Sequence, residues 1–320
     1  MNLDLDQMER MRRPGRKIQG ISAVLLPYEK NGRMDEAGFL RHLQRTLDAG
    51  LRPAVNMDTG YGDLLTPGEK RQVLDWTEQV TVGRDGFIAG VLPQEKTTIS
   101  YARECEAIRK RGGVPIIFPS EYTAQLDDEG LRRFFYEIAQ AAECFMAFEL
   151  GSMFNPNGRM FSVPVLQNLL ETPQCVGLKH SSLNRQTEIQ RIQLRDRLRP
   201  DFSIFSGNDL AADMVEYGSD YLLGLSTLAP ELFATRDRAW EEGRAEYFEL
   251  RDMIQYLGWV TFRDPVPAYK HSAAIFLKLT GGLKSDEPHP RAPRRESWDR
   301  QLLADAARRM QQFCPQGTRP

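Results

Sequence analysis

Short apolar runs recur along the chain and predict the strands of a parallel sheet. Most of them are rich in Val, Ile, Leu or Phe and are nearly continuous rather than alternating, as expected of strands that are covered on both faces. The eight runs are ISAVLLP (21–27), PAVNMD (53–58), FIAGVL (87–92), VPIIFP (114–119), FMAFEL (145–150), CVGLKH (175–180), FSIFSG (202–207) and YLLGLST (221–227).

Segments with helical periodicity separate these runs. Examples are 36–49, 67–82, which has a proline in its first turn, and 131–142. Strand-like runs that return about every thirty residues fit a closed (β/α)8 barrel, the TIM barrel, better than a doubly wound sheet. No Gly-rich phosphate-binding loop follows the first run, which also argues against the doubly wound alternative.

The chain continues beyond the eighth run with more helical sequence than a barrel needs. Helices are predicted over 231–257, 265–279 and 297–313, and the Pro- and Gly-rich segment 281–295 reads as a loop. We therefore predict three regions, an N-terminal extension, the barrel and a C-terminal helical extension, which span 1–17, 18–243 and 244–320.

Composition and charge exclude several classes of protein. The chain is 41% hydrophobic and 27% charged with a formal net charge of -2, so no nucleic-acid partner is indicated. The basic residues between Arg10 and Lys17 precede no apolar segment of the signal-peptide type, and no run approaches the roughly 18 apolar residues of a membrane span. We expect a soluble, cytoplasmic protein without a membrane partner.

The cysteines and histidines do not form a metal-binding or disulfide pattern. No CxxC pair occurs, and the histidines are scattered, so we expect reduced, packed thiols, no metal and no cofactor. These residues are Cys105, Cys144, Cys175, Cys314, His42, His180, His271 and His289.

A lysine closes the sixth apolar run, in the stretch CVGLKHSS. Burial of an ammonium ion is costly, so Lys179 either extends to solvent at the strand end or serves as a neutral amine nucleophile. In barrels the active site lies at the carboxyl-terminal ends of the strands, which is where this lysine stands. Other polar residues follow the predicted strands and complete a ring at the same end: Asp58, Thr59, Gly60, Tyr122, Glu149, Ser181, Gly207, Asp209 and Ser226.

Four motifs together resemble the dihydrodipicolinate synthase and N-acetylneuraminate lyase family, whose members act on 2-keto acids through a lysine Schiff base. GLKHSS is similar to the family's Schiff-base strand, MDTGYGDLLTPGEK (57–70) to its G-T-T-G-E segment, FSGNDL (205–210) to its G-x-[DE] turn, and DPVPAYK (264–270) to its N-P-x-P-x-K segment. The motifs occur in the family's order, and the resemblance covers roughly residues 18–310.

The resemblance implies roles for matching residues. Lys179 condenses with the keto group, and Thr59 with the Gly60 amide holds the substrate carboxylate. Gly207 and Asp209 line the pocket beside the rest of the substrate. Strand alternation places Ser181 on the same side as Lys179.

The chain departs from the family at two positions. Asp58 replaces the first threonine of the T-T pair, which belongs to a hydroxyl relay, and Phe148 or Glu149 stands where the family has its catalytic tyrosine. A proton shuttle is still required, and Glu149, Asp58, Tyr122 or His180 could supply it. Two carboxylates at one edge of the barrel would raise the pKa of one of them.

Each candidate also has a structural interpretation. Asp58 is a common helix cap or turn residue, Glu149 could face outward to a basic residue, and Tyr122 could be a loop aromatic. His180 alternates away from Lys179 and suits a packing role. Arg159 is a candidate for the family's arginine, although an apparent insertion leaves its register open.

The sequence therefore predicts a class I lyase or aldolase that acts on a 2-keto acid through a Lys179 Schiff base. A dehydratase of deoxy-keto sugar acids, which uses the same imine, is one alternative. Another alternative is a degenerate family member that binds such acids without turnover. The loss of the tyrosine favours this alternative, and the retained Lys179 argues against it. The resemblance also implies a homo-oligomer, a dimer or a tetramer.

Overall fold

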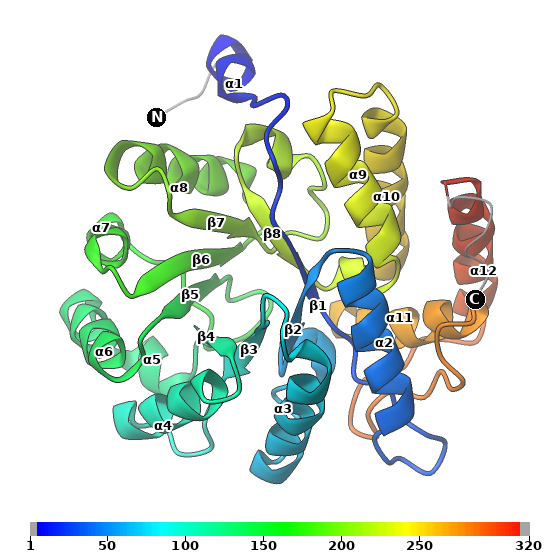
Figure 1. Cartoon of the computed structure of the whole chain (residues 1–320), viewed down its shortest axis with the longest axis horizontal. Helices are drawn as coiled ribbons and strands as arrows, with labels where there is room; N and C mark the ends of the chain where they lie inside the picture. The colour runs from blue at the N-terminus through cyan, green and yellow to red at the C-terminus, as the bar shows by residue number, and fades with distance from the viewer. Residues whose placement is uncertain (1–4, 314–320) are drawn as a thin grey trace. The chain divides into compact units, whose positions relative to one another are not determined.

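The computed structural model describes residues 5–313, and its strands follow one another in chain order around a closed barrel (Figure 1). Every pair whose register is defined is parallel. The eight strands are β1 (Gly20–Ala23), β2 (Arg52–Val55), β3 (Phe87–Val91), β4 (Gly113–Ile117), β5 (Phe145–Leu150), β6 (Cys175–Ser181), β7 (Ser203–Ser206) and β8 (Asp220–Leu223). Each of the eight predicted runs overlaps one strand, which confirms the (β/α)8 barrel.

Helices connect the strands, and many begin at a side-chain cap of the kind that satisfies free N–H groups. Asp35, Thr97, Asp127, Ser162 and Asn184 each accept a hydrogen bond from a backbone N–H in the first turn. The helices are α2 (Glu36–Asp48), α3 (Pro67–Thr81), α4 (Thr98–Arg109), α5 (Glu121–Gln125), α6 (Asp128–Ala141), α7 (Val163–Glu171), α8 (Arg185–Leu198) and α9 (Pro230–Glu241). Between β7 and β8 the connection contains the short 3-10 helix η2 (Met214–Tyr217).

The helix predicted over 231–257 is wrong in one respect, because the chain forms two helices there, α9 and α10 (Tyr247–Thr261). Gly243 adopts a φ of +66° just after α9, a conformation that ends a helix and that glycine reaches at little cost. Helices α11 (Tyr269–Leu279) and α12 (Asp299–Met310) follow, and α1 (Leu5–Met11) precedes the barrel. Our boundary at 243/244 falls between α9 and α10, and the two extensions run beyond the described residues at 1–4 and 314–320.

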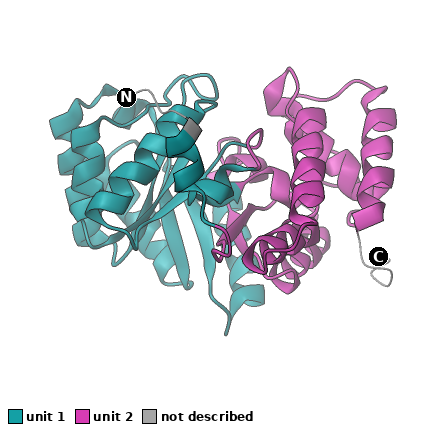
Figure 2. Cartoon of the chain, turned by 90° about the horizontal axis from the view of Figure 1, so that it is seen from above, with its two compact units in different colours: residues 1–13, 67–208, 213–222 teal, residues 14–66, 209–212, 223–320 magenta. Residues whose placement is uncertain are grey.

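The chain divides into two compact units, coloured separately in Figure 2. Unit 1 comprises residues up to 13, 67–208 and 213–222, and it contains β3 to β7 and most of β8. Unit 2 comprises 14–66, 209–212 and 223 onward, and it contains β1, β2 and the C-terminal helices. Each unit brings together a separate set of the predicted site residues.

The cysteines that the structure describes are free thiols, as predicted. Cys105 and Cys175 are buried, and burial raises the pKa of each thiol to about 12. Cys314 lies outside the described residues. Within residues 5–313, no helix combines the length and the apolar character needed to cross a membrane.

Candidate active site

Lys179 lies at the end of β6 in unit 1 and is only 9% exposed. Its register partner on β5 is Phe148, and its Nζ lies 4.4 Å from the centroid of the Phe148 ring. Phe118 packs edge-on against that ring, with centroids 5.0 Å apart. The amine is thus held against an aromatic wall and partly removed from water, as a lysine nucleophile requires.

Gly207 makes room for the lysine. A Cβ atom at this position would lie 1.9 Å from Ser181 Oγ and 2.8 Å from Lys179 Cε, so the Ser181 and Lys179 side chains would have to move. The Gly207 N–H donates to the carbonyl of His180 at 2.7 Å, which holds the loop close to β6. The structure therefore brings together three of the predicted residues, Lys179, Ser181 and Gly207.

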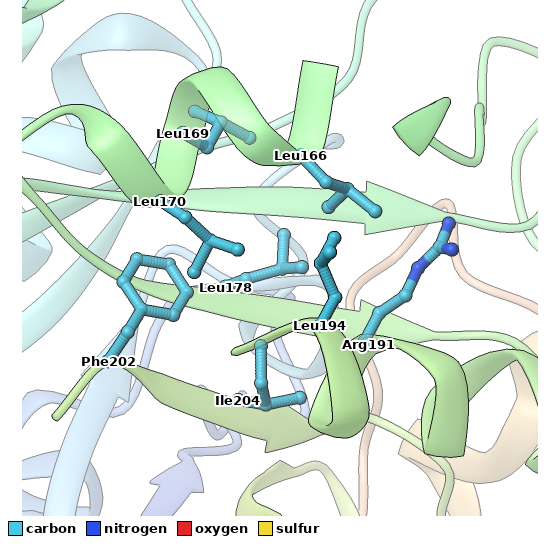
Figure 3. Close-up of a pocket in the computed structure, with 8 residues that line it drawn as sticks. All are labelled: Leu166, Leu169, Leu170, Leu178, Arg191, Leu194, Phe202 and Ile204. Carbon is cyan, nitrogen blue, oxygen red and sulfur yellow. The ribbon is translucent and has the colours of Figure 1, made fainter. Parts of the chain in front are cut away.

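The opposite face of β6 packs against helices. Figure 3 shows a small cavity there, and one charged residue reaches its edge. Its lining residues are Leu166, Leu169, Leu170, Leu178, Arg191, Leu194, Phe202 and Ile204. Since Leu178 faces α7 and α8, strand alternation turns Lys179 and Ser181 to the barrel interior and His180 to the helices. This apolar cavity is therefore separate from the lysine.

Glu149 lies on the helix-facing side with His180. Its carboxylate accepts hydrogen bonds from Arg191 Nε at 2.9 Å and from the Phe161 backbone N–H at 2.8 Å. His180 Nδ1 lies 2.6 Å from the same carboxylate, and His180 Nε2 lies 2.8 Å from Ser182 Oγ. Glu149 and His180 are fully buried.

Of the two carboxylates for which we expected one raised pKa, Glu149 is not the one. Burial alone would raise this pKa, but the hydrogen bonds and charges of His180 and Arg191 outweigh it and lower the pKa below its ordinary value. A carboxylate held in this way cannot readily take up a proton, and it faces away from Lys179. We therefore do not assign the proton shuttle to Glu149 or to His180, and Phe148 is the residue that faces the lysine where the family has its tyrosine.

Unit 2 contains a second group of predicted residues, at the turn after β2. Asp58 accepts hydrogen bonds from Lys270 Nζ and from the Tyr269 hydroxyl, both at 2.9 Å. The Tyr269 hydroxyl also lies 2.9 Å from Thr59 Oγ1. Thr59, Tyr269 and Lys270 are buried, whereas the Asp58 side chain is 55% exposed. Burial and the nearby Asp58 charge raise the pKa of Tyr269 well above its usual value.

Three further predicted residues of unit 2 have internal partners. The Gly60 N–H donates to the Met57 carbonyl at 3.1 Å. Asp209 accepts a hydrogen bond at 2.8 Å from the N–H of Leu225, the first residue of the 3-10 helix η3 (Leu225–Thr227). The Ser226 hydroxyl is fully buried and lies 2.9 Å from both the Leu223 carbonyl and Ser22 Oγ.

Two candidates of unit 1 lie against helices. The Tyr122 hydroxyl is 3.2 Å from Thr98 Oγ1 of α4, and its ring packs on Phe134 of α6. Arg159 binds Asp128 at 2.6 Å. These contacts support structural roles, so we propose no catalytic role for either residue.

Sequence reasoning missed Tyr269. Tyr269 and Lys270 both stand inside the DPVPAYK segment, which the family motif already marks. The sequence pattern does not show, however, that helix α11 packs against the turn after β2. Among residues 5–313, no three His, Cys, Asp or Glu side chains gather in a way that could hold a metal ion.

Comparison with known proteins agrees with the motifs. The profile of the dihydrodipicolinate synthetase family matches residues 17–275. A 4-hydroxy-tetrahydrodipicolinate synthase from Gluconacetobacter diazotrophicus is 27% identical over 270 residues, which cover 82% of this chain and 87% of the relative. A probable 5-dehydro-4-deoxyglucarate dehydratase from Streptomyces avermitilis is also 27% identical, over 82% of this chain and 77% of its own length.

Solved structures share the fold. A prophage protein of the dihydrodipicolinic acid synthase family from E. coli K12, in complex with pyruvate, has a TM-score of 0.81 at 14% identity and covers 92% of this chain and 98% of its own. The sialic acid aldolase of Ruminococcus gnavus has a TM-score of 0.77 at 18% identity, with 93% and 98% covered. The chain belongs to the dihydrodipicolinate synthetase family, whose members are class I aldolases and lyases.

Proposed function

We propose that this lyase forms an imine between Lys179 and a 2-keto acid. The observation that carries the proposal is the position of Lys179, a buried amine at the end of β6 that faces the barrel interior beside Phe148. The absence of a side chain at Gly207 keeps the path of the lysine clear.

The chemistry follows from the amine. Lys179 Nζ attacks C2 of the keto acid, and loss of water from the carbinolamine gives the imine. The protonated imine withdraws electrons from C3. When a hydroxyl at C4 loses its proton, the C3–C4 bond breaks, an aldehyde leaves, and an enamine remains to be protonated at C3.

A dehydratase is the second candidate. There a proton leaves C3 and hydroxide leaves C4, and the same imine carries the charge. The 27% identity to the probable dehydratase from Streptomyces avermitilis supports this dehydratase route. The 27% identity to the Gluconacetobacter diazotrophicus synthase supports the carbon–carbon lyase route. Both routes need the imine, so they share one test.

Substrate contacts remain proposals from the resemblance. Thr59 is proposed to hold the carboxylate, and Ser181, Gly207 and Asp209 to line the site. The Gly60 amide, which the resemblance also suggests for the carboxylate, already donates its N–H to the Met57 carbonyl. Ser226 keeps only a supporting role, because its hydroxyl is occupied by Leu223 and Ser22. A homo-oligomer, either dimer or tetramer, and a cytoplasmic location are likewise proposed from the family.

The test is reduction with borohydride in the presence of excess pyruvate, followed by intact-mass analysis. We expect the wild type to gain one reduced pyruvyl group and Lys179→Ala to gain none. Lys270→Ala is the matched control, because Lys270 is also a buried lysine but is held in an ion pair with Asp58. An adduct that persists in Lys179→Ala and disappears in Lys270→Ala would reject the assignment.

A further inference from the structure

Ser182, His180 and Glu149 form one hydrogen-bonded row within unit 1. His180 Nε2 lies 2.8 Å from Ser182 Oγ, and His180 Nδ1 lies 2.6 Å from Glu149 Oε1. A hydroxyl within hydrogen-bond reach of a base, which a third group orients, is the arrangement of nucleophilic catalysis. We propose that Ser182 is the nucleophile of a second active site, which hydrolyses esters without the participation of Lys179.

Glu149 sets the orientation of the histidine. Arg191 Nε and the Phe161 N–H donate to the Glu149 carboxylate at 2.9 and 2.8 Å, and an ionised carboxylate only accepts hydrogen bonds. His180 Nδ1 therefore carries the proton that points to Glu149. A neutral imidazole in this tautomer presents the Nε2 lone pair to Ser182, and Arg191 already balances the Glu149 charge.

The Ser182 hydroxyl has two neighbouring acceptors for its one proton. His180 Nε2 lies at 2.8 Å, and the Asn184 carbonyl lies at 3.4 Å, so the proton belongs to the shorter contact with the imidazole. The Asn184 N–H donates to Ser182 Oγ at 3.1 Å and holds the oxygen in place. The serine is thus oriented as a nucleophile whose proton already points to the base.

Ser182 stands in the short turn between β6 and α8, at the end of the barrel strands where active sites occur. A nucleophile in a strand-to-helix turn is followed by the first N–H groups of the helix, which have no partner within that helix. Arg185 is the first residue of α8, three positions after Ser182. Its N–H is assigned to the oxyanion that forms when Ser182 attacks a carbonyl.

Exposure along the row rises toward the nucleophile. Glu149 and His180 are fully buried, Ser182 is 9% exposed, and the next residue, Leu183, is 43% exposed. The orienting carboxylate and the base are thus shielded from water, while the serine lies at the edge of the buried region. This is the order of burial that a nucleophile open to substrate requires.

The loop after β5 adjoins the end of β6, because the Gly151 N–H donates to the Ser181 carbonyl at 2.8 Å. That loop carries two exposed apolar side chains, Met153 and Phe154, and a Cβ atom on Gly151 would lie 3.8 Å from each of them. With Leu183 they give the surroundings of the serine an apolar character. The substrate class is therefore an uncharged ester with an apolar acyl group.

The reaction balances with water as the only co-reactant. Ser182 Oγ attacks the ester carbonyl carbon while its proton moves to His180 Nε2. The carbonyl–oxygen bond of the ester then breaks, and the alcohol leaves with that proton. Water gives a proton to His180 and attacks the acyl-serine, the acid is released, and His180 returns the proton to Ser182.

The test labels the wild-type protein with an alkyl fluorophosphonate, which reacts with activated serines, and locates the label by intact mass and peptide mapping. We expect one label, on Ser182, and none on Ser182→Ala. His180→Asn keeps an amide donor for Glu149 but lacks the base, so it should be labelled roughly 100-fold more slowly. Ser162→Ala is the matched control, because Ser162 only caps α7 through the Val165 N–H, and its labelling should equal that of the wild type.

A second measurement follows the hydrolysis of p-nitrophenyl butanoate. We expect the wild type to turn over repeatedly and Ser182→Ala to lose this activity, with thermal melting as the check that each variant is folded. Acylation of a lysine would release at most one nitrophenol per lysine and then stop, which would contradict the proposal. Absence of label from Ser182 in the wild type, or equal labelling rates in the wild type and His180→Asn, would overturn it. Neither result depends on whether Lys179 forms an imine.

Discussion

The Nζ of Lys179 lies 4.4 Å from the centroid of the Phe148 ring, and the two residues are direct partners across β5 and β6. A phenylalanine has no proton to exchange, so the residue beside the lysine shapes and dries its surroundings but does not assist proton transfer. The lysine keeps an aromatic neighbour, and the proposed imine chemistry would need a proton carrier from another part of the chain.

Gly207→Ala should strongly reduce imine formation while the protein remains folded. The new methyl group would overlap Ser181 Oγ and press on Lys179 Cε, and the lysine would have to leave its position. We expect at least a ten-fold loss of the borohydride-trapped pyruvate adduct, with a thermal transition close to that of the wild type. Gly151→Ala is the matched control, because its nearest contact would be an ordinary 3.6 Å, and it should trap pyruvate normally. Equal trapping by both variants would show that Gly207 has no steric role.

Glu149→Gln should lower stability much more than it lowers imine formation. The substitution leaves Arg191 buried without its carboxylate, and breaking such a pair typically costs about 3–5 kcal/mol. The free energy of unfolding, measured in urea, should fall by this amount, while the adduct per folded molecule is unchanged. A stable variant with no adduct would instead make Glu149 a catalytic residue.

The same carboxylate predicts an acid-sensitive fold. Because the pKa of Glu149 is lowered in the folded state, its stabilisation is present above the ordinary glutamate pKa and disappears as the pH falls through the folded value. Melting temperature against pH should therefore drop on the acid side in the wild type and change less in Glu149→Gln. If the melting temperatures of the two proteins changed equally with pH, the lowered pKa of Glu149 would be contradicted.

Glu188→Gln should have the opposite pH dependence. Glu188 is buried in α8 and accepts hydrogen bonds from Ser206 and Ser219 at 3.2 and 2.7 Å. Burial raises its pKa despite the His180 charge and the two hydroxyls. The stability that this group contributes is complete below the ordinary glutamate pKa and is lost as the pH rises through the folded value.

Relative to the wild type, Glu188→Gln should therefore gain stability as the pH rises through this window. Urea unfolding of both proteins over a pH series measures the difference. Glu106→Gln is the matched control, because Glu106 lies on the surface, and its pKa is lowered by its hydrogen bond to Lys110. A wild type whose advantage over Glu188→Gln grows with pH would contradict the raised pKa.

The sequence alone was sufficient for the barrel and for its lysine. Eight nearly continuous apolar runs with helices between them fit few other folds, and alternation along β6 already placed Lys179 and Ser181 on one side and His180 on the other. The apolar runs, the helices between them and the alternation along β6 are patterns among residues close together in the chain, so they can be read directly from the sequence.

Tertiary structure decided the partners of the polar residues. Sequence left Phe148 and Glu149 as equal candidates beside Lys179, and only the register between β5 and β6 turned Phe148 toward the lysine and Glu149 toward Arg191. Thr59 and Tyr269 are separated by 210 positions, yet their hydroxyls lie 2.9 Å apart. No local period encodes such a contact, because it depends on how α11 packs against the turn after β2.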